Sequence, residues 1–443
     1  MRKYPVESAD LLIEARWVLP IAPANTVLDD HAVAVTDGRI VALGPTSQLM
    51  ARYAPRQRVV RNQHALLPGF VNAHTRAAMT LLRGLPPGSP RQQGLRASVR
   101  AAEQRCLSPD FVRAGTQLAI AEMLQAGITC FADMYGFPEE AARMAAAARM
   151  RAAIGLPVGG AGGGQPHEVT EQFAHAERLW DQYRSDPFIS LYFAPRDIGA
   201  MSDESLVRLR RVTDELDARL AAVVHADVAE VTASLSKHGQ RPLHRLHRLG
   251  LLRPGFAAVR MNQLDAADLA TLATTGSCVI LCPQADLRLG SALAPIGQLL
   301  HQHVNVGLGC GPMVAGAALD LLAEARTAAL WTNAHGEELP AEEALLMATY
   351  GGAAALGLAG ETGSIEPGKS ADLVCIDLSA LACQPAGPPA EAIVFAATRQ
   401  QATDVWTSGR AAVSGGRLLA FDAQELTALA QAWAQRTATG EQA

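Results

Sequence analysis

One stretch decides how this chain is interpreted: Pro68-Gly69-Phe70-Val71-Asn72-Ala73-His74-Thr75-Arg76. Its apolar centre follows a Pro-Gly pair and predicts a short buried β-strand. The strand ends near His74, and Arg76 follows two residues later. A neutral imidazole donates a lone pair to a metal ion, but a guanidinium stays protonated at any accessible pH and cannot. His74 is therefore a candidate metal ligand, whereas Arg76 adds a fixed positive charge.

Length and composition indicate a large α/β protein. A chain of 443 residues is too long for one small core and fits a large barrel with a satellite domain. The net charge of −5 gives no indication of a nucleic-acid surface, and no uncharged apolar stretch is long enough for a membrane span. Seven cysteines at irregular spacing favour reduced thiols and a cytoplasmic location.

Strand-like runs alternate with amphipathic helices through the middle of the chain. Residues Phe111–Ala126 carry apolar side chains at helical spacing and predict a helix that ends at Gly127. A strand is predicted directly after it, at Ile128–Met134. Further short apolar runs occur at Ile189–Ala194, Ala221–His225, Ala257–Met261, Cys278–Cys282 and Val304–Gly309. This alternation predicts a (β/α)8 barrel, whose site would lie at the C-terminal ends of its strands.

Both ends of the chain carry short strands. Residues 9–67 contain apolar or alternating runs, with Asp37-Gly38 as a hairpin turn. Residues 363–374 read G-S-I-E-P-G-K-S-A-D-L-V, which resembles the point where members of the amidohydrolase superfamily leave the barrel and enter a small β-sandwich. The resemblance implies a composite sandwich of residues 1–66 and 369–424, a barrel of residues 67–368 and a helical tail of residues 425–443 that frays.

From about residue 9 to about residue 417 the chain resembles one subgroup of this superfamily, the TRZ/ATZ-type hydrolases that deaminate S-adenosylhomocysteine, methylthioadenosine or adenosine. In that subgroup a divalent metal is held by His-x-His after strand 1, one histidine after strand 5, one after strand 6 and an aspartate after strand 8. The metal lowers the pKa of its bound water to about 7 and polarises the bond under attack. The resemblance implies hydrolysis of a carbon–nitrogen bond and, by analogy, a homodimer.

Most of the ligand positions carry other residues. His74 matches the first position, and the four that differ are Arg76, Val223, Arg260 and Gly311. The glutamate that transfers protons in the subgroup falls on Ala226, and His225 lies two residues past a ligand position. Because so few donors remain, the main hypothesis is a folded protein that is inactive as a deaminase and needs no cofactor. Such a protein would bind a small anion or serve as a partner subunit.

The alternative hypothesis is an active enzyme with a rebuilt metal site. His74, His225, Cys282 and Cys310 all lie at predicted strand ends, and a set of cysteines and histidines can hold zinc. On this hypothesis His74, His225 and Cys310 bind zinc or another divalent metal, and the protein is a purine- or nucleoside-type deaminase. The simpler interpretation of the cysteines is that they are small buried hydrophobic residues.

Three arginines replace histidines that would face one cavity. A buried guanidinium without a partner is costly, so each needs a carboxylate or an anionic ligand such as a small acidic metabolite. Random drift is the competing explanation, because one base change converts histidine to arginine. The candidate ligand-binding residues are Arg76, Arg196, Arg260, Asp227 and Asp286. Glu103 and Asp133 are interpreted as hydrogen-bonded structural carboxylates.

Overall fold

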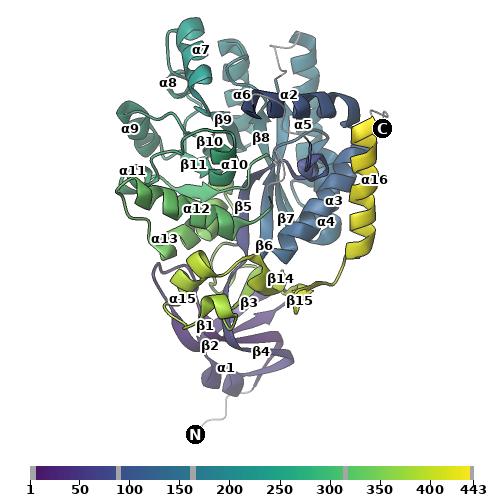
Figure 1. Ribbon diagram of the computed structural model, residues 1–443, viewed down its shortest axis with the longest axis vertical. Coiled ribbons are helices and arrows are strands. Elements are labelled where there is room, and N and C mark those ends of the chain that lie inside the picture. Colours follow the sequence, from purple (N-terminus) through teal and green to yellow (C-terminus); the bar gives the residue numbers. More distant parts are fainter. Residues whose placement is uncertain (1–5, 86–90, 160–165, 313–317, 440–443) are drawn as a thin grey trace.

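The computed structural model describes residues 6–85, 91–159, 166–312 and 318–439, and it contains two separate sheets (Figure 1). The first is an eight-stranded parallel sheet in which the strands follow one another in chain order. Its strands are β5 (Phe70–Thr75), β6 (Ile128–Asp133), β7 (Arg151–Val158), β8 (Ile189–Pro195), β9 (Arg219–Val224), β10 (Phe256–Arg260), β11 (Cys278–Leu281) and β12 (Val306–Leu308). This sheet confirms the predicted (β/α)8 barrel.

The barrel closes between its first and last strands. Thr75 forms a parallel bridge with Gly311, and the Gly311 N–H donates to the His74 carbonyl at 2.9 Å. A side chain at Gly309 would collide with the His74 backbone, because a Cβ there would lie 2.6 Å from the His74 nitrogen. The absence of a side chain at this position therefore lets the ends of β5 and β12 approach each other closely.

Small and branched side chains fill the barrel interior. Residues such as Val71, Ala132, Ala153 and Val259 belong to one buried cluster, separate from the larger cluster beneath the helices. Inward residues of parallel strands stack in layers in this fold, so the interior is a packed core. The polar groups of a site must then gather above this core, at the C-terminal ends of the strands.

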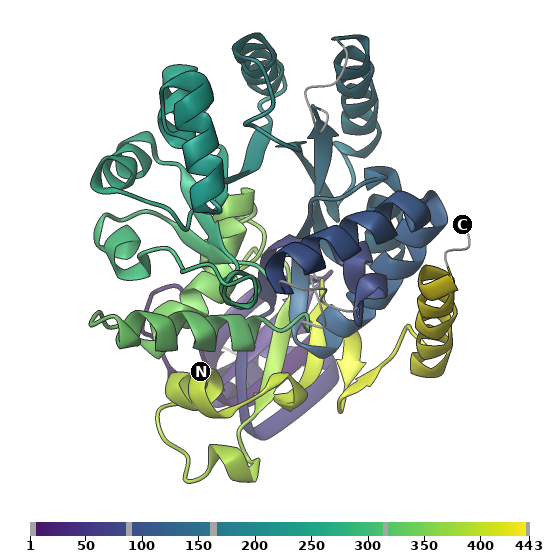
Figure 2. The same cartoon turned by 45° about the horizontal axis from the view of Figure 1, so that its top comes forward.

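The helices surround the barrel (Figure 2). They are α2 (Arg91–Cys106), α3 (Pro109–Gln125), α4 (Pro138–Ala148), α5 (Pro166–Tyr183), α6 (Asp203–Glu215), α7 (Val228–His238), α8 (Pro242–Arg248), α9 (Ala266–Thr275), α10 (Pro283–Arg288), α11 (Ile296–His301), α12 (Leu321–Ala334), α13 (Ala341–Leu346) and α14 (Gly352–Leu356), with a 3-10 turn η1 at Ala77–Leu82 and a π-helical turn η2 at Met347–Gly351. The α3 helix shows why such segments form where they do. Ser108 accepts a hydrogen bond from the Phe111 N–H at 3.2 Å, Pro109 occupies the first turn, and Gly127 follows with a φ of 80°.

The second sheet joins both ends of the chain. Its strands are β1 (Glu7–Val18), β2 (Leu28–Thr36), β3 (Arg39–Pro45), β4 (Tyr53–Pro68), β13 (Leu373–Asp377), β14 (Ala402–Thr407), β15 (Arg410–Ser414) and β16 (Arg417–Leu418). The β4 strand pairs in parallel with β1 on one side and antiparallel with β13 on the other. We call this the composite sheet, and most of its pairings are antiparallel.

The remaining helices flank the composite sheet or the barrel. They are α1 (Thr46–Arg52), α15 (Pro389–Glu391) and α16 (Ala423–Thr439), with short η3 (Leu381–Cys383), η4 (Ala392–Ala396) and η5 (Arg399–Gln401) turns. The α16 helix runs along the side of the barrel in Figure 1. Its Trp433 is buried against Phe111, so the described part of this helix is attached to α3. The predicted fraying of the tail stays a prediction, and residues 440–443 lie outside the described residues. Among the residues that the structure describes, we find no helix with the length and hydropathy that a membrane crossing requires.

The orientation of β5 locates the candidate site. This strand begins beside the composite sheet, where the Gly69 N–H donates to the Asp372 carbonyl at 2.8 Å. It therefore ends at the opposite side of the barrel, and the other parallel strands end there too. We call this side the mouth. In Figure 1 the composite sheet lies at the bottom and α2 crosses the upper part of the molecule.

Candidate functional site

His74 lies at the mouth, at the end of β5. His74 is only 2% exposed to solvent. Burial, followed by the charges of Arg76 and Arg260, lowers the pKa of His74 to about 3. The imidazole is therefore neutral at physiological pH, and both arginines act on it electrostatically.

Arg260 forms a buried ion pair at the end of β10. Its Nε donates to the Asp286 Oδ1 at 2.5 Å, and its Nη2 contacts the same oxygen. The side chains are 10% and 1% exposed. Burial raises the pKa of Asp286, although Arg260 acts in the opposite direction. The structure therefore supplies Asp286 as the carboxylate partner that the buried Arg260 requires.

The backbone is unusual at the same place. Arg260 has a φ of 83° and Met261 a φ of 51°, and His225 at the end of the neighbouring β9 has a φ of 54°. Residues with side chains rarely adopt this left-handed conformation, and its cost is often found at functional sites. The conformation turns the chain sharply where β9 and β10 reach the mouth.

Arg76 has a different environment from Arg260. Within the described residues, its side chain makes no ion pair or hydrogen bond, and its Nε is buried. The positive charge of Arg76 acts on the carboxyl group of Asp133, at the end of β6. Asp133 accepts a hydrogen bond from the Ala77 N–H at 2.6 Å. Burial raises the pKa of Asp133 to about 7, although that N–H and Arg76 both lower it.

His225 is a structural residue in this arrangement. Its Nδ1 lies 3.1 Å from the Gln263 carbonyl, and its Nε2 accepts from the Leu243 N–H at 3.1 Å. Burial lowers the pKa of His225 to about 4, although Asp268 acts in the opposite direction. Nδ1 donates to a carbonyl and the lone pair of Nε2 accepts from a backbone N–H, so the ring has no free lone pair for a metal ion.

Cys310 is also held for a structural reason. Its N–H donates to the Asn72 Oδ1 at 2.9 Å, and its side chain is buried. Burial raises the pKa of the Cys310 thiol well above its usual range, and the nearby Glu324 raises it further. Cys282 behaves in the same way. These residues match the simpler interpretation of the cysteines as buried hydrophobic groups.

The five positions at which the subgroup holds its metal do not fit a metal ion in this chain. His74 offers one nitrogen, whereas Arg76 and Arg260 carry fixed positive charge. Val223 is apolar, and Gly311 has no side chain. A cation beside two guanidiniums would also be repelled. These five positions therefore offer no ligand set for a metal ion.

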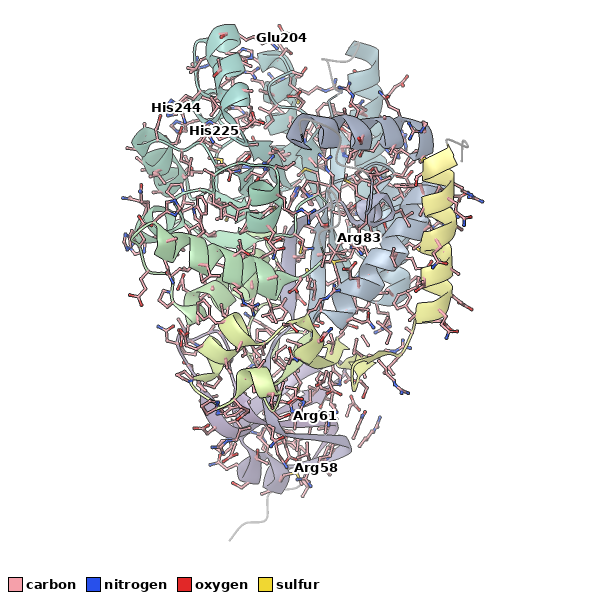
Figure 3. The ribbon with its side chains drawn as sticks, viewed as in Figure 1. Arg58, Arg61, Arg83, Glu204, His225 and His244 are labelled. Carbon is pink, nitrogen blue, oxygen red and sulfur yellow. The ribbon has the colours of Figure 1, made fainter. Side chains whose placement is uncertain are left out.

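A different group of donors lies beside α8 and the start of α9. His244, Asp265 and Asp268 each offer a ligand atom, and within the described residues these three atoms lie within 4.8 Å of one another. His244 and His225 both contact Asp268, at 3.4 and 3.5 Å. Figure 3 labels the two histidines close to each other in the upper part of the molecule. Arg241 also binds both carboxylates, at 3.1 Å for Asp265 and 2.7 Å for Asp268. Nitrogen and carboxylate donors suit zinc, but Arg241 competes for them.

The other predicted ligand-binding residues are Arg196 and Asp227, which follow β8 and β9 at the mouth. Arg196 is exposed and lines a hollow of about 700 Å³ between α4 and α5, where His175 and Arg178 also lie. Asp227 caps the start of α7, and its Oδ1 accepts from the Glu230 N–H at 3.0 Å. The structure therefore pairs Arg260 with Asp286, and it places Arg196 and Asp227 just after β8 and β9, at the same end of the barrel.

Sequence reasoning missed two buried carboxylates near the mouth. Glu230 accepts from the N–H groups of His225 and Ala226, at 3.0 and 2.8 Å, and so fixes the end of β9. Glu324 on α12 accepts from the Gln284 N–H at 2.8 Å. A single glutamate in a helical segment gives no signal of such a role. The contact depends on chain segments that only the fold brings together.

A family model and named relatives both match most of this chain. The family model described as "Amidohydrolase family" matches residues 65–412, and a bacterial imidazolonepropionase-like composite domain matches residues 32–54. A protein of Teredinibacter turnerae named 5-methylthioadenosine/S-adenosylhomocysteine deaminase is 36% identical over 430 residues, covering 96% of this chain and 97% of that one. A protein of Saccharophagus degradans with the same name is 35% identical, with 96% of each chain covered.

Solved structures agree in fold. The crystal structure of an adenosine deaminase from Xanthomonas campestris with bound zinc is 41% identical, with a TM-score of 0.94 over 98% of this chain and 100% of that one. A triazine hydrolase variant has a TM-score of 0.86 at 21% identity, which supports the fold alone.

These relatives correct two expectations. Relatives named as deaminases match nearly the whole chain, and one similar structure contains zinc. The hypothesis of a protein that is inactive as a deaminase is therefore wrong, and the expectation that no cofactor is needed is not supported. The comparisons favour the alternative, an active hydrolase of carbon–nitrogen bonds. The main hypothesis was wrong because it gave more weight to the changed residues at the five ligand positions than to the resemblance along the rest of the chain.

Proposed function

The chain belongs to the amidohydrolase family, and from that premise we propose that it is an active aminohydrolase that deaminates a purine- or nucleoside-type substrate. The observation that carries this proposal is the likeness to the zinc-bound adenosine deaminase, at 41% identity over 98% of the chain. The relatives named as 5-methylthioadenosine/S-adenosylhomocysteine deaminases support the same class of substrate.

Asp133 is our candidate for proton transfer in this reaction. Deamination requires that a water molecule lose a proton while the departing amine gains one. A carboxyl group with a pKa of about 7 can both accept and release a proton at neutral pH. One oxygen of Asp133 is held by the Ala77 N–H, which leaves the other for this transfer. Arg76 lies close enough to act on the pKa of Asp133, so it can also stabilise negative charge that develops nearby.

A metal ion would supply an activated water, as zinc does in hydrolases of this kind. The five positions at which the subgroup holds its metal do not fit a metal ion in this chain. We therefore propose His244, Asp265 and Asp268 as a rebuilt metal centre. For Arg241, this proposal requires that it give up at least one of its carboxylate contacts when the ion binds.

The test is ammonia release from adenosine, 5′-methylthioadenosine and S-adenosylhomocysteine by the purified protein. We expect saturable release that falls roughly 100-fold or more in Asp133→Asn, because one acid–base group contributes about 10²–10⁴ in rate. The matched control is Asp197→Asn, which changes an exposed carboxyl at the end of β8 and should leave the rate unchanged. No ammonia from any of the three substrates would contradict the proposal.

The metal centre has its own test. The metal content of the protein is measured after growth with zinc, and again for His244→Ala and for the control His247→Ala on the exposed face of α8. A rebuilt centre predicts stoichiometric metal in the wild type and in the control, and its loss in His244→Ala. Metal that persists in His244→Ala would remove this centre from the proposal. The homo-oligomeric state and the cytoplasmic location stay predictions from the sequence.

A further inference from the structure

A hollow lies between the segment that follows η1, the helix α2 and the last turns of α16. Its volume is about 520 Å³, within the range of roughly 300–1,000 Å³ that is typical of small-molecule sites. Figure 3 shows Arg83 on the side of the barrel along which α16 runs. The lining residues that matter here are Leu81, Arg83, Leu85, Ala101, Arg105 and Ala434.

The wall of this hollow carries an excess of positive charge. Arg83 donates to the Oε2 of Glu122 at 2.6 Å, but the Oε1 of Glu122 is paired with Arg399 at 2.9 Å. One carboxylate therefore serves two guanidiniums. Within the described residues Arg105 has no carboxylate at ion-pair distance, and its Nη2 reaches the Thr437 carbonyl at 3.5 Å.

Arg83 also has an unused donor. Its Nε is buried and finds no hydrogen-bond acceptor in the part of the chain that the structure describes. Buried nitrogens of this kind are almost always paired, and leaving one unpaired costs stability. The carbonyls at the end of α16 contribute a partial negative charge of about one half. This is smaller than the charge of Arg105 alone, so the wall still attracts an anion.

We propose that this hollow is a binding site for an amphiphilic carboxylate, a ligand with an anionic head and a short apolar body. Arg83 and Arg105 line it together with the apolar side chains of Leu81, Leu85 and Ala101. A guanidinium holds a carboxylate through charge-assisted hydrogen bonds, and burial of the apolar body adds to the affinity. The inference goes beyond the proposed function, because none of these residues is assigned to the reaction.

The hollow adjoins an element that reaches the mouth. Leu81 belongs to η1, and the N–H of Ala77, the first residue of η1, donates to Asp133 at 2.6 Å. A ligand that packs on Leu81 therefore contacts the turn that positions Asp133. Because a ligand stabilises the closed form of the segment it contacts, we expect local opening of η1 to become rarer when the hollow is filled.

The first experiment measures binding by thermal unfolding with hexanoate, and with 1-hexanol as the uncharged control. We expect hexanoate to raise the Tm of the wild type and 1-hexanol to leave it unchanged. In Arg105→Gln the apparent affinity for hexanoate should fall about 10-fold or more. Arg100→Gln is the matched control, since it removes an exposed arginine of α2 that does not line the hollow. Equal stabilisation by the alcohol, no stabilisation by hexanoate, or equal affinity in Arg105→Gln would overturn the inference.

A second pair of variants keeps both arginines in place. Ala434 is an exposed residue of α16 that lines the hollow. Ala434→Glu adds a competing carboxylate to the wall and should abolish the effect of hexanoate, whereas Ala434→Gln, of equal size, should retain most of it. Hydrogen exchange by peptide should show slower exchange in residues 77–85 with hexanoate in Ala434→Gln and no change in Ala434→Glu. Equal responses of the two variants would place the ligand elsewhere and overturn the inference. Neither measurement involves turnover, so these outcomes are independent of ammonia release.

Discussion

The Arg260–Asp286 pair is the most deeply buried charge interaction at the mouth, and a double-mutant cycle can measure its contribution. Asp286→Ala leaves a guanidinium that is only 10% exposed without its partner. We expect the free energy of unfolding to fall by about 3–5 kcal/mol, because an uncompensated buried charge is costly. Arg260→Met combined with Asp286→Ala should recover most of that loss. Urea unfolding measures the wild type, Asp286→Ala, Arg260→Met and the double variant, and a change below about 1 kcal/mol in Asp286→Ala would show that water reaches Arg260.

Glu324 predicts a dependence of stability on pH. Burial raises the pKa of this carboxyl from 4.5 to about 8, although the Gln284 N–H lowers it. The folded state therefore binds the proton more tightly than the unfolded state. The resulting stability is fully present below pH 4.5 and is lost as pH rises to about 8.

The variant Glu324→Gln does not titrate, so the difference between it and the wild type isolates the effect of this proton. With increasing pH inside that window, the wild type should lose up to roughly 1.4 kcal/mol per unit relative to the variant. Urea unfolding at several pH values measures this difference. A constant difference across the window would mean that Glu324 is ionised in the folded protein.

Individual residues at the mouth were predictable only in part. The strand patterns placed His74, Arg76 and Arg260 correctly at strand ends, because a parallel strand has a recognisable apolar run. The choice of Asp286 as the partner of Arg260 required the fold, since these residues belong to separate segments. For the same reason the sequence did not show that His225 is engaged by the backbone of Leu243 and Gln263.

At the scale of elements, α16 should be attached to the barrel mainly by one aromatic contact. Trp433 packs edge-on against Phe111 of α3, with ring centroids 5.4 Å apart, and it is 5% exposed. We expect Trp433→Ala to lower the free energy needed to detach α16 from the barrel by about 3–5 kcal/mol, because it removes a large buried side chain. The helix should then detach before the barrel unfolds.

Hydrogen exchange resolved by peptide measures this detachment. In Trp433→Ala, amides of α16 should exchange much faster than in the wild type, while amides of β6 and β7 should not change. Leu419→Ala changes an exposed residue just before the helix and serves as the control. Unchanged protection of α16 in Trp433→Ala would mean that its other contacts are sufficient.

The elements themselves followed from the sequence wherever local signals were strong. The α3 helix has a serine cap, a proline in its first turn and a glycine after its end, and its predicted bounds were close to those observed. The attachment of α16 was not predicted, although Leu426, Leu429 and Trp433 recur at helical spacing on one face. Its stability comes from the pairing of Trp433 with a residue more than three hundred positions earlier.

At the scale of the whole molecule, the (β/α)8 barrel and a sheet built from both termini were predictable. The Gly363–Val374 pattern marked the return of the chain to the composite sheet, and β13 begins there beside β4. Activity was not predictable in the same way. The losses at Arg76 and Arg260 argued against a metal at one point, and they contained no information about the burial of neighbouring groups such as Asp133.

The barrel and the composite sheet should unfold as one unit because a buried ion pair links them. Arg151 on β7 donates to the Asp372 Oδ2 at 3.1 Å, and these side chains are 8% and 2% exposed. Asp372 also accepts from the Ser408 N–H at 2.7 Å, so its carboxylate connects both parts.

We expect Asp372→Ala to separate two transitions that coincide in the wild type, with the composite sheet melting first. Asp404→Ala is the matched control, since it breaks a buried pair with Arg61 inside the composite sheet and leaves the link intact. Melts are followed by circular dichroism and by the fluorescence of Trp406, in a background whose other four tryptophans are replaced by phenylalanine. Both signals should shift together in Asp404→Ala and apart in Asp372→Ala, and coincident signals in Asp372→Ala would show that the remaining interface carries the coupling.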